Sequence, residues 1–83
     1  MEYILTDHAR KRMRERKITG DDIRSALENP TKIGYDKNGN VLIKKLYTRE
    51  NKERLLILVG DKEGNHSFRI FTVIDTSKVK KYL

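Results

Sequence analysis

Residues 54–59 read Arg-Leu-Leu-Ile-Leu-Val, a nearly continuous apolar run. A strand with one face in water alternates apolar and polar side chains, whereas a strand buried on both faces is apolar throughout. The run therefore predicts the central strand of a sheet that is covered on both faces, and the other elements are expected around it.

Strand-like segments flank this central run on both sides. Residues 32–36 and 41–48 are predicted strands, and the Asn38-Gly39 pair between them favours a tight hairpin. Residues 49–53 are predicted to be a polar connection, and residues 67–74 are the last predicted strand. The four strands are expected to form an antiparallel meander.

The N-terminal third is predicted to be helical. Thr6 suits the N-cap of a helix over residues 7–17, and Thr19 suits the N-cap of a second helix that ends at Asn29-Pro30. The short apolar segment before Thr6 is consistent with a brief edge strand. The expected fold, over residues 1–83 as one domain, is α+β: an N-terminal strand and a helical hairpin packed on a four-stranded antiparallel sheet, with a short C-terminal helix.

Composition limits the function further. The chain has 83 residues, 19 Lys or Arg against 12 Asp or Glu, a formal charge of +7 and no cysteine. The missing cysteines exclude a disulfide scaffold, a thiolate nucleophile and a Cys-based zinc site. No apolar run approaches a membrane span and no signal-peptide pattern is present, so a cytoplasmic location without a membrane partner is expected. An acidic partner is expected, with nucleic acid the leading class.

The positive charge is concentrated in two segments. Residues 10–17 carry a net +5 and residues 77–83 a net +3, whereas residues 18–76 sum to +1. If folding brings the two segments together, they form one electropositive surface. The alternative is two separate solvated helix faces that are both basic.

His8 is the first candidate for chemistry. It lies in the first turn of the basic helix, with Arg12 and Arg16 on the same face at successive turns. A neutral imidazole there can accept a proton, as a general base must. The alternative is that His8 packs against the sheet or bonds a backbone carbonyl.

Arg69 and the C-terminal segment are the other candidates. Arg69 interrupts an apolar strand, which suggests that it holds a phosphate, although a pair with an acid is the alternative. The C-terminal segment suits phosphate contacts and stacking of a base on an aromatic ring, or a capped turn docked on the core. The residues concerned are Thr76, Ser77, Lys78, Lys80, Lys81 and Tyr82, with Lys44, Lys45 and Tyr47 as weaker additions.

Several other sites are not expected. The two histidines lie far apart and no metal-binding arrangement of His and Glu occurs, so no metal is predicted. No phosphate-binding loop, dinucleotide fingerprint or nucleophile elbow is present either. No cofactor is therefore expected.

The segment from Thr6 to Thr19 is similar to the "T-x-HA-x-x-R-M-x-x-R-x-I" opening of the DUF4258 domain. Residues 21–30 and 72–83 also resemble that family. The family is grouped with the RelE/ParE-like toxins of the barnase–colicin–RelE ribonucleases. The resemblance implies a RelE-like sheet packed by N-terminal helices, and a metal-independent endoribonuclease that uses the RNA 2′-hydroxyl as nucleophile.

The resemblance also implies roles for particular residues. His8 would act as base or acid, Arg12 and Arg69 would hold the phosphate, and Thr76 or Ser77 would contribute with Lys78. The predicted function is a small RNA-acting domain, a toxin-like endoribonuclease of a toxin–antitoxin system. Its partners would be RNA, in one version presented by the ribosome, and an acidic antitoxin. The alternative is a non-catalytic module of the same fold that binds nucleic acid or protein.

Overall fold

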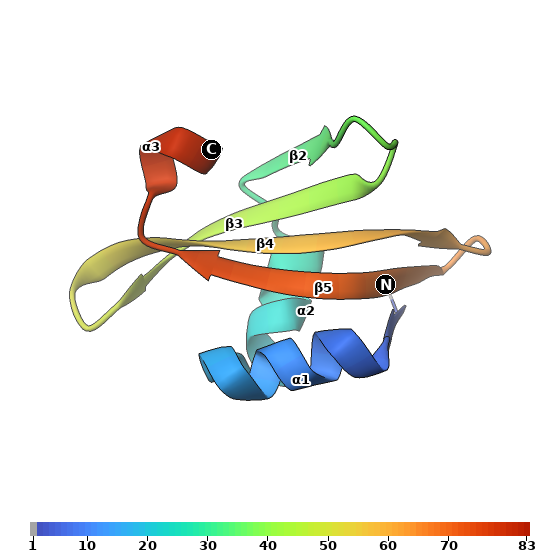
Figure 1. Ribbon diagram of the computed structural model, residues 1–83, viewed down its shortest axis with the longest axis horizontal. Coiled ribbons are helices and arrows are strands. Elements are labelled where there is room, and N and C mark those ends of the chain that lie inside the picture. Colours follow the sequence, from blue (N-terminus) through green and yellow to red (C-terminus); the bar gives the residue numbers. More distant parts are fainter. Residues whose placement is uncertain (1) are drawn as a thin grey trace.

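The apolar run at residues 54–59 lies within β4 (Lys52–Glu63), the middle strand of a five-stranded sheet with the order β1-β5-β4-β3-β2. The computed structural model describes residues 2–83 (Figure 1). Four consecutive residues of β4, from Leu55 to Leu58, are each 5% exposed or less. The prediction of a central strand buried on both faces is therefore confirmed.

The predicted four-stranded antiparallel sheet is wrong, because the N-terminal segment is a fifth strand within the sheet. β1 (Glu2–Leu5) pairs in parallel with β5 (Ser67–Thr76), from Glu2 opposite Ser67 to Leu5 opposite Ile70. β5 is an apolar strand with two edges, and β4 occupies only one of them. Pairing with β1 satisfies backbone groups on the other edge and packs Tyr3 and Leu5 against the core. The sheet is consequently mixed.

The remaining strands pair antiparallel, as predicted. β2 (Lys32–Tyr35) pairs with β3 (Val41–Arg49), and β3 pairs with β4. The predicted polar connection at residues 49–53 is shorter than expected, since the two strands meet at Arg49 opposite Lys52. Only Glu50 and Asn51 form the turn, with φ values of 52° and 63°. Two central residues with positive φ match the twist of a tight hairpin.

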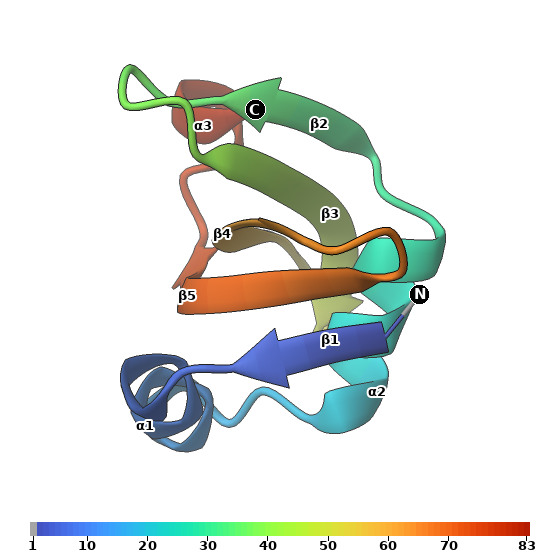
Figure 2. The ribbon, with the colours of Figure 1, turned by 90° about the vertical axis from the view of Figure 1, so that its right-hand side faces the viewer.

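Helices α1 (Asp7–Arg16) and α2 (Gly20–Glu28) bury their apolar sides in one core with the sheet. Both predicted N-caps are confirmed: Thr6 accepts from the Ala9 N–H, and Thr19 forms a reciprocal capping box with Asp22. The helix starts are thus set by the sequence itself. Figures 1 and 2 show α1 alongside the second half of β5, where β1 has already ended.

The short helix α3 (Val79–Tyr82) lies on the opposite face of the sheet from α2 (Figure 1). Lys44 donates its Nζ–H to the Tyr82 carbonyl at 2.6 Å, and Lys32 donates to the Leu83 carbonyl at 2.9 Å. Ile43 belongs to the core that the sheet forms with α1 and α2. Because side chains alternate along a strand, the neighbouring Lys44 points to the other face. We call the two sides the α1/α2 face and the α3 face.

The two basic segments do not merge. Both views place α1 below and α3 above the central strands of the sheet (Figures 1 and 2). The alternative of two separate basic surfaces is therefore the one that the fold adopts. Among residues 2–83, no helix has the length and apolarity that crossing a membrane requires.

Candidate nucleic-acid interface

The three predicted residues of α1 lie on successive turns of that helix. His8 is exposed, and no hydrogen bond to its side chain is formed within residues 2–83. Arg12 is partly buried and pairs with Glu15, with 3.5 Å between Nη1 and Oε1. Arg16 is exposed, and its carbonyl accepts from Arg49 at 3.4 Å. The helix therefore presents a histidine and an arginine side by side, but the arginine already has an acidic partner.

The two predicted residues of β5 are far from each other. Arg69 and Thr76 are seven positions apart on one strand, which at about 3.3 Å per residue separates their Cα atoms by roughly 23 Å. Arg69 is exposed and pairs with Glu63 at 3.5 Å, which is the alternative weighed from the sequence. The Thr76 hydroxyl accepts from the Lys78 N–H at 3.1 Å. One catalytic centre cannot contain both residues.

The two lysines of β3 serve as internal donors. Lys44 bonds the carbonyl of Tyr82 on the α3 face, as described above. Lys45 points to the α1/α2 face and donates to the carbonyl of Asn29 at 2.7 Å, just beyond the end of α2. Each ammonium lies beside the C-terminal end of a helix, where the carbonyl dipoles favour a cation. Their charges are consequently committed to holding helices in place.

The C-terminal residues form a groove that we call the α3 groove. Its volume is about 520 Å³, and Ser77, Lys78, Lys80 and Lys81 line it together with Glu53. No acidic side chain of residues 2–83 lies within 4.0 Å of the three lysine ammonium groups. The next residue, Tyr82, is 42% exposed, and the Lys81 ammonium lies 5.3 Å from the centroid of its ring. Unpaired cations beside an exposed ring suit a phosphate backbone with a stacked base.

A charged network that sequence reasoning missed joins β3, β4 and β5 on the α1/α2 face. The Asp75 side chain is 5% exposed and accepts from Tyr47 at 2.6 Å and from Arg54 at 3.1 Å. Arg49 lies 3.9 Å from the same carboxylate and also donates to the carbonyls of Arg16 and Lys17. Alternation along β5 could have revealed it, since Asp75 shares a face with the buried Val73.

The network affects the protonation of its members. Burial, and then the hydrogen bond to Asp75, raise the pKa of Tyr47 above its usual value of 10.0. The hydrogen bond to Asp75 also raises the pKa of Arg54. Both donors therefore keep their protons near neutral pH, so the network is an anchor rather than a source of acid or base.

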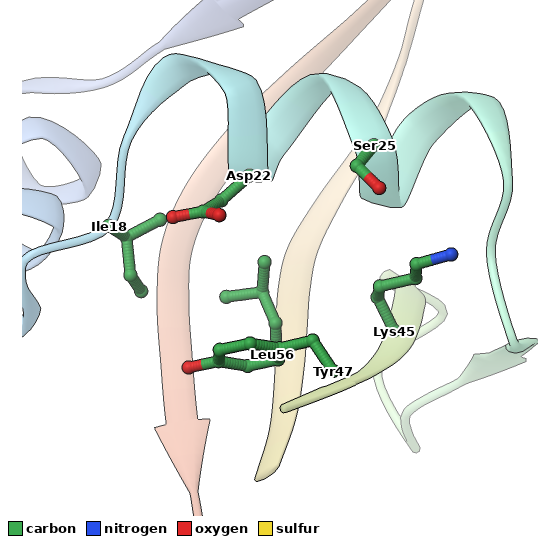
Figure 3. A pocket seen from close by; sticks show the side chains of 6 residues that line it. All are labelled: Ile18, Asp22, Ser25, Lys45, Tyr47 and Leu56. Carbon is green, nitrogen blue, oxygen red and sulfur yellow. The ribbon is translucent and has the colours of Figure 1, made fainter. Parts of the chain in front are cut away.

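A small cavity lies between α2 and the sheet. Its lining includes Asp22 and Ser25 of α2 and Lys45 and Tyr47 of β3, and Figure 3 shows these side chains around the space between helix and sheet, with the Lys45 ammonium directed away from it. The cavity volume is about 40 Å³. That is room for water molecules but far less than the several hundred Å³ of a nucleotide-sized pocket. Within residues 2–83, no group of three or more His, Asp or Glu side chains is placed to hold a metal ion.

The chain matches one family in comparisons with known proteins. The sequence model of the family described as "Domain of unknown function (DUF4258)" matches residues 5–80. This range includes α1, α2 and the four strands from β2 to β5. No curated protein and no solved structure matches the chain. Membership of the RelE-like superfamily stays a prediction from the sequence. Because the matched range covers most of its length, the chain belongs to the DUF4258 family.

Proposed function

We propose that this protein binds single-stranded RNA in the cytoplasm and that the α3 groove holds the RNA backbone. The observation that supports the proposal best is the set of three unpaired lysines, Lys78, Lys80 and Lys81, around one groove. Ser77 adds a hydroxyl that can donate to a phosphate oxygen. Tyr82 adds an exposed ring on which an unpaired base can stack.

The lysines in this groove differ from several cations of the sheet, which already have a partner. Arg49 and Arg54 share Asp75, and Lys44 bonds a carbonyl. A phosphate that approached those groups would have to replace an existing partner. At the α3 groove, which Glu53 also lines, no ion pair of the three lysines has to be broken, and a phosphate would release their counterions, which is the source of most nonspecific affinity for nucleic acid.

RNA cleavage of the RelE-like kind is the second candidate, and it centres on α1. The observation in its favour is that His8 is exposed and Arg12 lies one turn away on the same helix. In this second candidate function, the protein would be the toxin of a toxin–antitoxin pair and would cleave RNA that the ribosome presents. It has less support than RNA binding, because Arg69 is paired with Glu63 and Thr76 lies roughly 23 Å from Arg69 along the strand.

Fluorescence anisotropy with a labelled single-stranded RNA tests the binding proposal. The triple variant Lys78→Gln/Lys80→Gln/Lys81→Gln should lose roughly tenfold or more in affinity at low salt, and the slope of log affinity against log salt should fall by about 2. A charge-matched control, Lys11→Gln/Arg14→Gln/Lys17→Asn, removes two cations from α1 and one from its C-cap. Equal losses in both variants would mean that RNA responds to net charge alone and would contradict the assignment to the α3 groove.

The same RNA distinguishes binding from cleavage. Incubation with the protein, with and without ribosomes, should leave the RNA intact if the protein only binds. Products with 2′,3′-cyclic phosphate ends that disappear in a folded His8→Ala variant would instead establish the second candidate.

A further inference from the structure

A second groove, on the other side of the molecule, runs beside α1. We call it the α1 groove. Its floor is apolar and consists of Leu5 from the end of β1, Met13 from α1, and Ile18 from the connection to α2. Its volume is about 490 Å³, which is large enough for side chains of a partner. The groove is thus comparable in size to the α3 groove but has a different chemistry.

The rim of the α1 groove is cationic. Arg10, Arg14 and Lys17 line it: Arg10 and Arg14 lie one turn apart on α1, and Lys17 follows at the C-cap of the helix. Arg14 and Lys17 have no acidic side chain within 4.0 Å among residues 2–83, whereas Arg10 lies 3.7 Å from the exposed Asp7. No acidic residue lines the groove.

The groove is preformed because the end of α1 is fixed. Lys17 adopts the left-handed conformation at φ 56°, and the Ile18 N–H bonds the Met13 carbonyl at 2.9 Å. Arg49 donates to the Lys17 carbonyl at 3.3 Å and is held in turn by Asp75. A site whose backbone is already ordered loses less conformational entropy on binding.

We propose that the α1 groove binds an acidic, amphipathic segment of a partner protein. Aliphatic side chains of the segment would lie on the partly buried Leu5 and Met13, next to the 6% exposed Ile18, and carboxylates one turn apart would face the three cations. RNA fits less well, because the floor offers neither an aromatic ring for stacking nor polar groups that read base edges. A second copy of the chain also fits less well, because its charge of +7 would bring cations against cations.

Titration with a labelled helical peptide tests this proposal. The probe is a peptide of roughly 14 residues, long enough for helix formation, with Leu at i, i+4 and i+7 and Glu on the flanking positions. Its binding should shift the amide NMR signals of Leu5, Met13 and Ile18. The variant Arg14→Gln/Lys17→Asn should lower its affinity at least fivefold, and Asn at position 17 tolerates the left-handed backbone. A probe with Ser in place of Leu should bind at least tenfold more weakly.

Two controls decide between this groove and simple charge attraction. The charge-matched variant Lys80→Gln/Lys81→Gln should bind the probe like the wild type, and single-stranded RNA should not displace the probe. Equal weakening by both variants, equal affinity of the Ser probe, or displacement by RNA would each overturn the proposal. Failure of RNA binding at the α3 groove would leave the peptide result unaffected, because the two experiments use different variants and different ligands.

Discussion

The two faces of the sheet are stabilised in different ways. The α1/α2 face carries two capped helices, an apolar core and the buried Asp75 network, in which three side chains from neighbouring strands share one carboxylate. The α3 face carries a helix of four residues whose last carbonyls accept from Lys32 and Lys44. The α1/α2 face thus carries two helices and a charged network, whereas the α3 face carries one short helix beside β4, whose Leu55 and Ile57 are at most 5% exposed (Figure 1).

This difference shows why net charge is a poor guide to a binding surface. On both faces some cations are committed to structure: Arg49 and Arg54 to Asp75, Lys44 to the end of α3. Among residues 2–83, the α3 groove gathers three cations without an acidic partner within 4.0 Å, and the rim of the α1 groove gathers two, Arg14 and Lys17. Strong effects on stability and strong effects on binding should therefore come from different residues.

The largest effect is expected from the change Asp75→Ala on the α1/α2 face. It leaves Tyr47, Arg54 and Arg49 without their shared acceptor in a partly desolvated site, at a cost of about 3 kcal/mol in the free energy of unfolding. Urea denaturation measures that cost. The control Glu63→Ala breaks only the exposed ion pair with Arg69 and should cost less than about 1 kcal/mol. Equal costs would mean that the network does not hold this face together.

The Asp75 network is also an example of a feature that the sequence did not predict. The central strand and both helix N-caps were predictable, because alternation and capping are local patterns. The place of β1 was not, since a parallel partner 65 residues away leaves no local signal. For Asp75 the local signal was partial: alternation along β5 puts it on the face of the buried Val73, but its donors lie on two other strands, whose register is known only from the structure.

The candidate site residues also fall into those predictable from local sequence and those that depend on long-range contacts. The lysines of the α3 groove were predicted from a run of neighbouring residues, and the fold keeps that run together. The group of His8, Arg12, Arg69 and Thr76 depended on contacts between distant segments, and the fold places Arg69 and Thr76 at separate points of β5. Residues that are neighbours in the sequence could be assigned to one site directly, whereas contacts between distant segments could not be predicted.

A second effect, also on the α1/α2 face, is expected from the change Gly60→Ala. A Cβ at Gly60 would lie 2.0 Å from the Arg69 carbonyl oxygen and 3.0 Å from the Phe68 ring, next to the irregularity in the β4–β5 register. The strands would have to separate, which should cost about 2 kcal/mol and lower the melting temperature. Gly34→Ala in β2 is the matched control, since nothing lies within 4 Å of its Cβ, and its effect should stay within about 0.5 kcal/mol. A similar loss in both variants would contradict the close approach.

The smallest effect is expected on the α3 face from the change Lys44→Met. It keeps the aliphatic stem but removes the ammonium that bonds the Tyr82 carbonyl. This exposed contact contributes about 0.5–1 kcal/mol to the free energy of local opening of α3. The loss should be local: hydrogen exchange should quicken at the Tyr82 and Leu83 amides, which close α3, while the urea midpoint hardly moves. Lys45→Met, which removes a donor to Asn29 on the other face, should leave exchange in α3 unchanged.

The RNA affinity of the Lys44→Met variant tests whether Lys44 anchors α3 or contacts phosphate directly. If Lys44 only anchors α3, Lys44→Met should weaken RNA binding modestly, through disorder of the groove, and much less than the triple α3 variant. A loss of affinity as large as that of the triple variant, with exchange in α3 unchanged, would make Lys44 a direct phosphate contact. The α3 groove would then extend onto β3, and the division between anchoring and binding cations on this face would be wrong.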